Sequence, residues 1–321
     1  MKQTTFASLA WSSKGKVTKR ERFLAEMDAV MPWARLLALI EPHYPSDGLG
    51  RPRKDLELML RVYFLQQWFN LSDPQAEESL YDSESMRRFA GIELGETAVP
   101  DESTILRFRH LLEQHQLTRA MFEQVRGLLE ERNLYLKSGT IVDATIISAP
   151  SSTKNASQER DPEMGSTKKG ASWHFGMKVH IGTDKRGLTH EITGTSASVN
   201  DFTQLPELLH GQEQELYGDR SYWSEEHRWL CREVGMRYRV NRRGKRAHDL
   251  SRAQRRINRS RSRIRARVEH PFNVVKRLWG FTKVRYRGLA KNLARAYALF
   301  ALANLYLVRR RLLPTGAQCV L

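Results

Sequence analysis

Residues 139–149 read GTIVDATIISA, and this stretch decides the fold of the second half of the chain. β-Branched residues dominate it, which predicts a buried strand. Asp143 stands in the middle of this run, among Ile, Val, Thr and Ala. Burying a lone carboxylate is costly, so a metal ion, an Arg or Lys partner, or hydrogen bonds must compensate it. The stretch therefore predicts both a sheet and a candidate functional position within it.

The residues after this strand continue with alternating strand and helix patterns. The polar and basic segment 151–172 is expected to be a loop or hairpin tip. Two more strands are predicted over residues 173–184 and 188–199, followed by a helix over 204–210 and a strand that runs into a turn over 214–222. A helix over 224–234 and a fifth strand over 236–242 complete this part. From about Ser251 the chain is helical, and Pro271 is expected to bend or restart that helix. This order predicts an α+β or α/β fold with a mixed sheet of the ribonuclease H-like kind.

The first third of the chain predicts helices only. Apolar spacing and helix-start signals place them over residues 18–29, 32–41, 55–71, 75–81, 84–89, 101–112 and 117–132. Short helices with tight turns resemble a helix-turn-helix DNA-binding domain, with Arg107 and Arg109 as candidate DNA contacts. The alternative is a plain helical bundle with solvated arginines. We expect a helical domain over 1–135, a mixed-sheet domain over 136–313 and a tail over 314–321.

The composition narrows the class of protein. The 321 residues include two cysteines, too few for a disulfide framework, and neither a signal-peptide stretch nor an apolar run of 18 residues is present. We therefore expect a soluble intracellular protein. Between Met236 and Arg311 there are 24 Lys and Arg against two acids, whereas the first 235 residues carry 29 basic and 34 acidic residues. This basic block predicts a polyanionic partner, and nucleic acid is favoured. The alternatives are a solvated basic helix or a basic tail that binds anionic lipid.

Two further acids are candidates to join Asp143. Asp219 ends the strand pattern ELYGD, where side chains of open α/β sheets face a crevice. Glu269 is one of only two acids in the basic block, and the alternative is a local salt bridge with Arg265 or Arg267. His174 and His180 are interpreted as ordinary strand histidines, because no third metal ligand accompanies them.

Several motifs in order make the chain resemble a known family. Residues 265–276, RARVEHPFNVVK, fit R-x3-E-x6-K, which is part of the signature Y-x2-R-x3-E-x6-K. With VDATIISAPSSTKN, WHFGMKVHIG and GDRSY, the sequence resembles the insertion sequence five family of bacterial DDE transposases over nearly its whole length. Two positions depart from the family. Ser262 replaces the signature tyrosine, which is expected to remove a phosphate contact, and Ser221 replaces a glycine, which is expected to alter a tight turn.

The resemblance implies DNA cleavage and joining at the ends of a mobile element. Asp143, Asp219 and Glu269 would be the catalytic residues and would hold two Mg²⁺ ions about 4 Å apart, with Mn²⁺ as a substitute. One ion would activate water or a 3′-OH, and the other would stabilise the leaving oxygen. Hard cations prefer oxygen ligands, which agrees with three acids and no Cys or His cluster.

The resemblance also implies partners and DNA contacts. Double-stranded DNA, as terminal inverted repeats and as target, is the expected partner of a homodimer in the bacterial cytoplasm, on the nucleoid. The N-terminal helices would read the repeats, and the basic block over 242–267 would carry the flanking duplex. The other expected DNA contacts are Arg265 and Lys276 at the scissile phosphate, then Tyr222, Arg267, Lys154 and Lys178. Two rivals remain: a DNA-binding regulator without catalysis, and a nuclease of the same fold that cuts but does not join.

Overall fold

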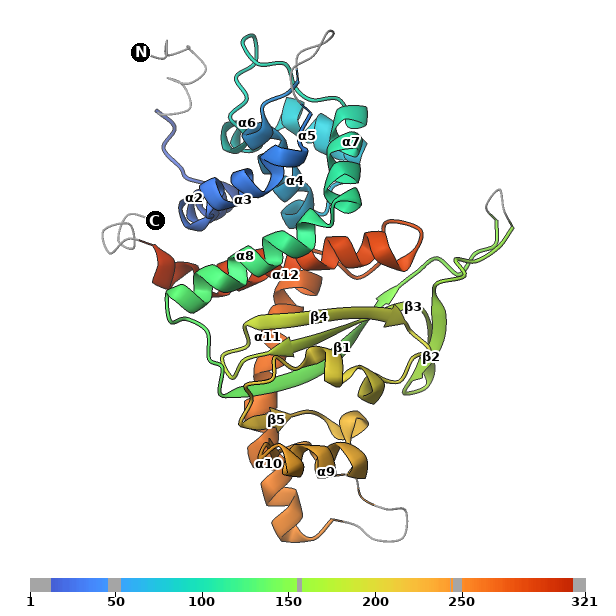
Figure 1. The fold of residues 1–321 in the computed structure, drawn as a ribbon. Coiled ribbons are helices and arrows are strands. Elements are labelled where there is room, and N and C mark those ends of the chain that lie inside the picture. The colour runs from blue at the N-terminus through green and yellow to red at the C-terminus, as the bar shows by residue number, and fades with distance from the viewer. Residues whose placement is uncertain (1–12, 46–52, 155–157, 243, 245–249, 314–321) are drawn as a thin grey trace.

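The computed structural model describes residues 13–45, 53–154, 158–242, 244 and 250–313. Its N-terminal part is helical, as expected, and lies above the sheet in Figure 1. The helices, with η for short non-α turns, are α2 (Lys19–Val30), α3 (Trp33–Ile40), η1 (Glu41–His43), α4 (Leu56–Phe69), α5 (Asp73–Asp82), α6 (Glu84–Ala90), α7 (Glu102–Gln114) and α8 (Leu117–Glu131). Side-chain caps at Thr18, Asp55, Ser72 and Asp101 accept backbone N–H bonds and fix where four of them begin.

The second part is a mixed sheet. Its strands are β1 (Gly139–Ser148), β2 (Gly165–Lys169), β3 (Ser172–Thr183), β4 (Thr189–Ser196), β5 (Glu215–Tyr217) and β6 (Arg237–Tyr238). β3 pairs antiparallel with β1, β2 and β4, whereas β5 runs parallel to both β1 and β6. The order β2-β3-β1-β5-β6, with β4 also on β3, is the ribonuclease H-like mixed sheet that the sequence predicts.

Two local predictions differ from the structure. The segment 151–172, expected to be a loop or hairpin tip, does contain a hairpin tip, but it also contains the strand β2, which pairs with the start of β3. Most of β2 is exposed, so it carries no apolar period that would reveal it in the sequence. The helix expected over 204–210 is instead two short turns, η2 (Asp201–Gln204) and η3 (Pro206–Leu208). Pro206 has no backbone N–H to continue a helix from η2.

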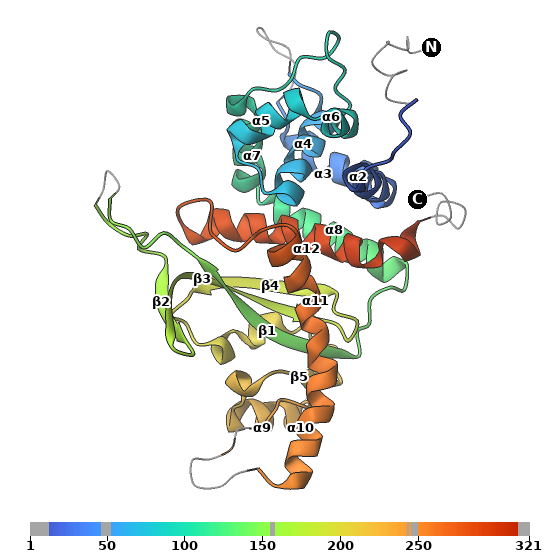
Figure 2. The ribbon, with the colours of Figure 1, turned by 180° about the vertical axis from the view of Figure 1, so that it is seen from behind.

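The remaining helices and turns lie on both faces of the sheet. Two of them, η4 (Arg220–Tyr222) and α9 (Glu225–Glu233), contribute Tyr222 and Cys231 to the smaller cluster described below. The others cross the opposite face and return to the N-terminal helices: α10 (Arg252–Arg265), η5 (Ala266–Val268), α11 (Glu269–Phe272), η6 (Asn273–Leu278) and α12 (Leu289–Leu312). Figure 2 shows α10 and α11 as one nearly continuous rod that extends beyond β5. Around Pro271 the backbone passes from a 3-10 turn through α11 into a π-helical turn, so the irregularity expected at this proline is present.

Helix α12 joins the two parts of the protein. It packs against α8, α2 and α4 on one side and against β4 on the other. One hydrophobic cluster therefore includes residues of the N-terminal helices, of α12 and of one sheet face. A smaller cluster around Val142, Leu216 and Tyr222 covers the opposite face. A domain boundary at residue 135 stays a prediction, and the tail 314–321 lies outside the described residues. None of the described helices has the length and hydropathy needed to cross a membrane.

Candidate active site

Two of the three predicted acids follow paired residues of neighbouring strands, Asp143 within β1 and Asp219 just after the end of β5. In the parallel pair of β1 and β5, Ile141 is level with Tyr217. Asp143 and Asp219 each follow two residues later, and the backbone of Asp219 is still extended. Because side chains alternate along a strand, both carboxylates point to the same sheet face, and neighbouring strands are about 4.8 Å apart. Ile141 and Tyr217 belong to the cluster that includes Val268 and Phe272, so this is the face that the C-terminal helices cover.

The third acid, Glu269, is brought to this face by the helix that begins with it. Val268, the residue before it, is fully buried in the same cluster as Ile141. At the preceding turn, Arg265 Nη1 lies 3.2 Å from Asp143 Oδ2, which ties the end of α10 to β1. Glu269 is exposed, and its carboxylate has no ion pair within the described part of the chain. The alternative of a salt bridge with Arg265 or Arg267 is therefore not observed.

The electrostatics of Asp143 reflect this arrangement. Burial raises the pKa of its carboxyl to about 7, while the Ala144 N–H and the Arg265 guanidinium lower it. The carboxylates of Asp219 and Glu269 raise the pKa of Asp143 again, so the three acids act on one another. Of the compensations considered for Asp143, the structure contains two, the Arg265 ion pair and the bond from Ala144 N to Oδ1, 2.9 Å long.

The donor set suits a hard divalent cation, because it is made of carboxylate oxygens on one face. As the side chains stand, no three His, Cys, Asp or Glu groups in the described ranges come together closely enough to hold a metal. A shared ion would therefore require side-chain rotation. Glu269 is free to rotate, since it is exposed and makes no ion pair among the described residues.

The two basic residues of the signature both contact β1. Lys276 Nζ donates to Thr145 Oγ1 at 2.8 Å and to the carbonyl of Ile146 at 3.0 Å, while Arg265 contacts Asp143. Burial, and then Lys169, lowers the pKa of Lys276. Thr145 is a site residue that sequence reasoning missed. Its signal was its position two residues after Asp143 in the same strand, hence on the same face.

The two departures from the family have visible local effects. Ser221 has no positive φ, so glycine is not needed there and the expected disturbance of the turn is not found. Instead, the backbone N–H of Ser221 donates to Asp219 Oδ1 at 2.7 Å, and its hydroxyl donates to the same oxygen. Ser262 accepts a bond of 3.0 Å from Asn241 Nδ2 and so faces the end of β6.

Three of the expected DNA contacts are not supported by their positions. Tyr222 is fully buried in the cluster on the opposite sheet face. Arg109 is buried between Asp73 and Glu113, at 3.1 and 2.9 Å.

Lys178 is nearly buried and donates to the carbonyl of Val199 at 2.7 Å, beside Asp201. Its neighbour His180 is fully buried, with Nε2 2.8 Å from Thr195 Oγ1, as suits a strand histidine. By contrast, three other expected contacts, Arg107, Arg267 and Lys154, are exposed.

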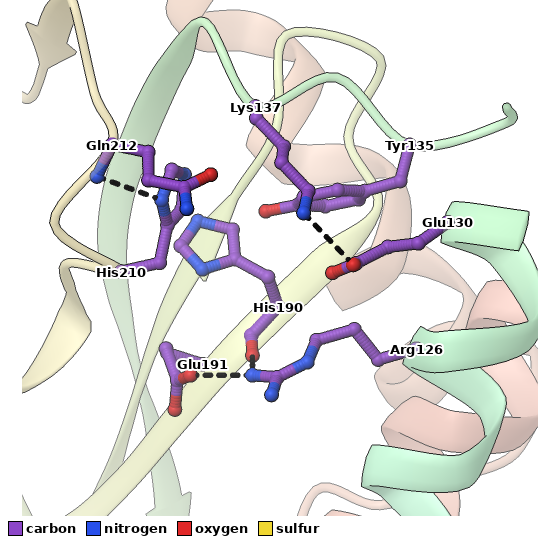
Figure 3. A pocket seen from close by; sticks show the side chains of 8 residues that line it. All are labelled: Arg126, Glu130, Tyr135, Lys137, His190, Glu191, His210 and Gln212. Carbon is purple, nitrogen blue, oxygen red and sulfur yellow. Dashed lines mark hydrogen bonds and ion pairs between the residues drawn. The ribbon is translucent and has the colours of Figure 1, made fainter.

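A separate cavity of about 320 Å³ lies at the other end of the strands, between α8, β4 and the segment before β5 (Figure 3). Its charged lining is paired internally: Arg126 with Glu191 at 2.7 Å and Lys137 with Glu130 at 3.0 Å. Because these charges neutralise each other, the cavity offers no excess charge of either sign to a ligand. The surface beside the three acids remains the candidate active site.

Comparison with known families agrees with this geometry. Residues 135–305, more than half of the chain, match the family described as "Transposase DDE domain". The chain belongs to the DDE transposase family. Residues 12–111 match "Transposase domain (DUF772)", and this pair of domains is typical of bacterial transposases of the insertion sequence four and five kind. The resemblance found in the sequence is confirmed.

Membership of the DDE transposase family identifies the chain as an enzyme that cleaves and transfers DNA, and such domains use divalent metal ions. One similar solved structure is described as "Crystal structure of the Mos1 Strand Transfer Complex". The match covers 85% of this chain and 100% of that chain, at 14% identity and a TM-score of 0.21. That likeness is too low to carry an argument about this transposase.

Proposed function

We propose that this transposase binds the terminal inverted repeats of its own insertion sequence and catalyses metal-dependent strand cleavage followed by strand transfer. Asp143, Asp219 and Glu269 are the proposed ligands of two Mg²⁺ ions, with Mn²⁺ as a substitute. The observation that carries the proposal is the parallel register of Ile141 with Tyr217, each two residues before Asp143 and Asp219, beside the helix that begins at Glu269. When bound, such ions polarise the phosphate and lower the pKa of an attacking water.

Arg265 and Lys276 are the proposed phosphate contacts at the scissile bond. The guanidinium of Arg265 donates one hydrogen bond to Asp143, and about a quarter of its side chain is exposed. Because a guanidinium carries five N–H donors, several are left for a phosphate. Lys276 uses two of its three donors on β1. Both cations are therefore held in position by β1 and still have N–H donors for a phosphate, so they can orient DNA while keeping their contacts with β1.

The remaining proposed contacts are exposed positive groups on other elements. Arg107 on α7 is proposed to contact the terminal repeat, and Arg267 and Lys154 the DNA beside the acids. We further propose a homodimer that bridges two element ends in the bacterial cytoplasm, on the nucleoid. The proposed division is an end-binding domain over residues 1–135 and a catalytic domain over 136–313.

The decisive experiment is a cleavage-and-joining assay with Mg²⁺ on duplexes taken from the flanks of the source gene. Asp143→Asn, Asp219→Asn and Glu269→Gln are each expected to slow cleavage more than about a hundredfold, because even residues that only orient a metal ligand cost 10–100-fold. Binding of the same duplex is expected to be preserved. Glu233→Gln, an exposed acid on α9, is the matched control and is expected to cleave normally.

The same assay separates the two rival functions. Cutting without joined product would indicate a nuclease, and salt-sensitive binding without cutting by the wild type would indicate a regulator. Near wild-type cleavage by any one of the three acid variants would remove that residue from the proposed metal site. Matched inverted repeats bordered by a short duplication in the flanking DNA would support transposition independently.

A further inference from the structure

Helix α10 carries a row of arginines along one face. Arg252, Arg256, Arg259 and Arg263 follow one another at helical spacings of four, three and four residues. At about 100° per residue, these four side chains lie within about 60° of one another around the axis, over a length of about 16 Å. All four are exposed, and none has a side-chain partner within the described residues. No acid occurs between residues 250 and 268.

The opposite face of α10 is the one that packs on the protein. Asn258 exchanges two hydrogen bonds of 3.1 Å with the backbone of Arg242, and Arg261 Nη1 donates to the carbonyl of Val240 at 2.7 Å. Ser262 accepts from Asn241, and Arg265 reaches Asp143. These residues also follow helical spacing, so one face holds the helix against β1 and the segment that follows β6, while the arginine row faces away.

The two faces have different neighbours. Arg265 lies about 150° around the helix axis from the middle of the arginine row, and an α-helix is about 10–12 Å wide. A DNA duplex is stiff over about 150 base pairs, so a straight duplex that touches Arg265 beside the acids cannot also wrap around α10. Figure 2 shows that α10 extends beyond β5, beside α9.

We propose that the arginine face of α10, defined by Arg252, Arg256, Arg259 and Arg263, binds a second DNA duplex, separate from the one whose strand is cut. This inference rests on the proposed function, because it divides the duplexes of that reaction between two surfaces. It also replaces the expectation that the whole basic block over 242–267 carries the flanking duplex, since it assigns the arginine face of that block to the second duplex. The surface binds through phosphates and reads no bases, since a row of guanidinium groups about 4.5–6 Å apart along the helix axis can contact several phosphates of one backbone.

The test measures capture of a second duplex by the full-length protein. An end duplex from the flanks of the source gene is immobilised and saturated with protein, and a labelled 30-base-pair duplex of random sequence is then added. Arg256→Gln, Arg259→Gln and Arg263→Gln are combined in one variant. This variant is expected to lose capture about tenfold or more and to lower the salt slope by about three, one for each lost phosphate contact. Cleavage of the end duplex is expected to stay within about twofold of wild type, because Arg265 and the acids are intact.

Two matched variants complete the design. The triple Lys variant at the same positions keeps the charge and is expected to restore capture. The second variant combines Arg132→Gln, Arg232→Gln and Arg311→Gln. It removes the same amount of charge from exposed positions on other elements, and it is expected to capture the second duplex normally.

Three results would overturn the inference. One is normal capture by the triple Gln variant, and another is loss of end cleavage in proportion to capture, which would place the cut duplex on this face. The third is competition by phosphatidylserine vesicles as strong as competition by DNA, which would indicate a lipid surface. If the wild type neither binds nor cuts the end duplex, the proposed function fails. The random duplex titrated alone against wild type and the triple Gln variant then still tests the arginine face.

Discussion

Arg109 offers a sharp test, because the sequence suggests a DNA contact, whereas the structure shows a buried arginine that pairs with two acids. Only 7% of its side chain is exposed. Its guanidinium pairs with Asp73 of α5 and Glu113 of α7 and lies 4.1 Å from the centre of the Tyr286 ring. It therefore links the N-terminal helices to the segment that precedes α12.

Replacing Arg109 by Ala leaves two nearly buried carboxylates without their cation. Asp73 and Glu113 are only 18% and 14% exposed, and breaking such a pair costs about 3–5 kcal/mol. Asp73 keeps a bond from Gln66, which reduces the loss, whereas the contact with Tyr286 adds roughly 1 kcal/mol. We expect Arg109→Ala to lower the free energy of unfolding by about 3–4 kcal/mol.

Urea unfolding followed by tryptophan fluorescence and by circular dichroism measures this loss. The control is Arg107→Ala, two residues earlier on the same helix but exposed, which is expected to change stability by less than about 0.5 kcal/mol. Arg107→Ala is expected instead to reduce the salt slope of end binding by about one. The reasoning is refuted if Arg109→Ala is as stable as wild type, or if its folded fraction has lost DNA affinity while Arg107→Ala has not.

Three further changes test other parts of the structure. Burial, together with the nearby charge of Lys178, lowers the pKa of His180 to about 4, although Asp201 raises it. A lowered pKa means that the unfolded chain binds the proton first, so wild type is expected to lose roughly 3 kcal/mol more than His180→Gln as the pH falls from 6.5 to 4; parallel unfolding curves would contradict this. Lys276→Met should slow single-turnover cleavage about tenfold or more, and an unchanged rate would remove Lys276 from the site. Ser221→Gly should lower stability by about 0.5–1 kcal/mol yet still cleave, since no positive φ is relieved; a rise in stability would show that serine is strained there.

The pattern of the chain determined the element types and the candidate acids. The run 139–149 predicts β1 because β-branched residues favour a strand wherever they occur. A carboxylate in such a run must be compensated, so the sequence by itself makes Asp143 a candidate. The helices of the N-terminal part were predictable for the same local reason, since capping residues and apolar spacing act within a few residues.

Tertiary structure decided which residues meet. Which compensation Asp143 uses could not be chosen from the sequence, because Arg265 reaches it across 122 positions of chain. Arg107 and Arg109 lie on opposite sides of α7, and the helical period alone places Arg109 with Ile105 and Leu112. That Asp73 of another helix pairs with Arg109 there is decided only by the tertiary structure. The spacing of the arginines on α10 is local, but which side of that helix faces the sheet depends on hydrogen bonds to distant strands. Local patterns define faces and periods, whereas the partner of each face is fixed only when non-local contacts form.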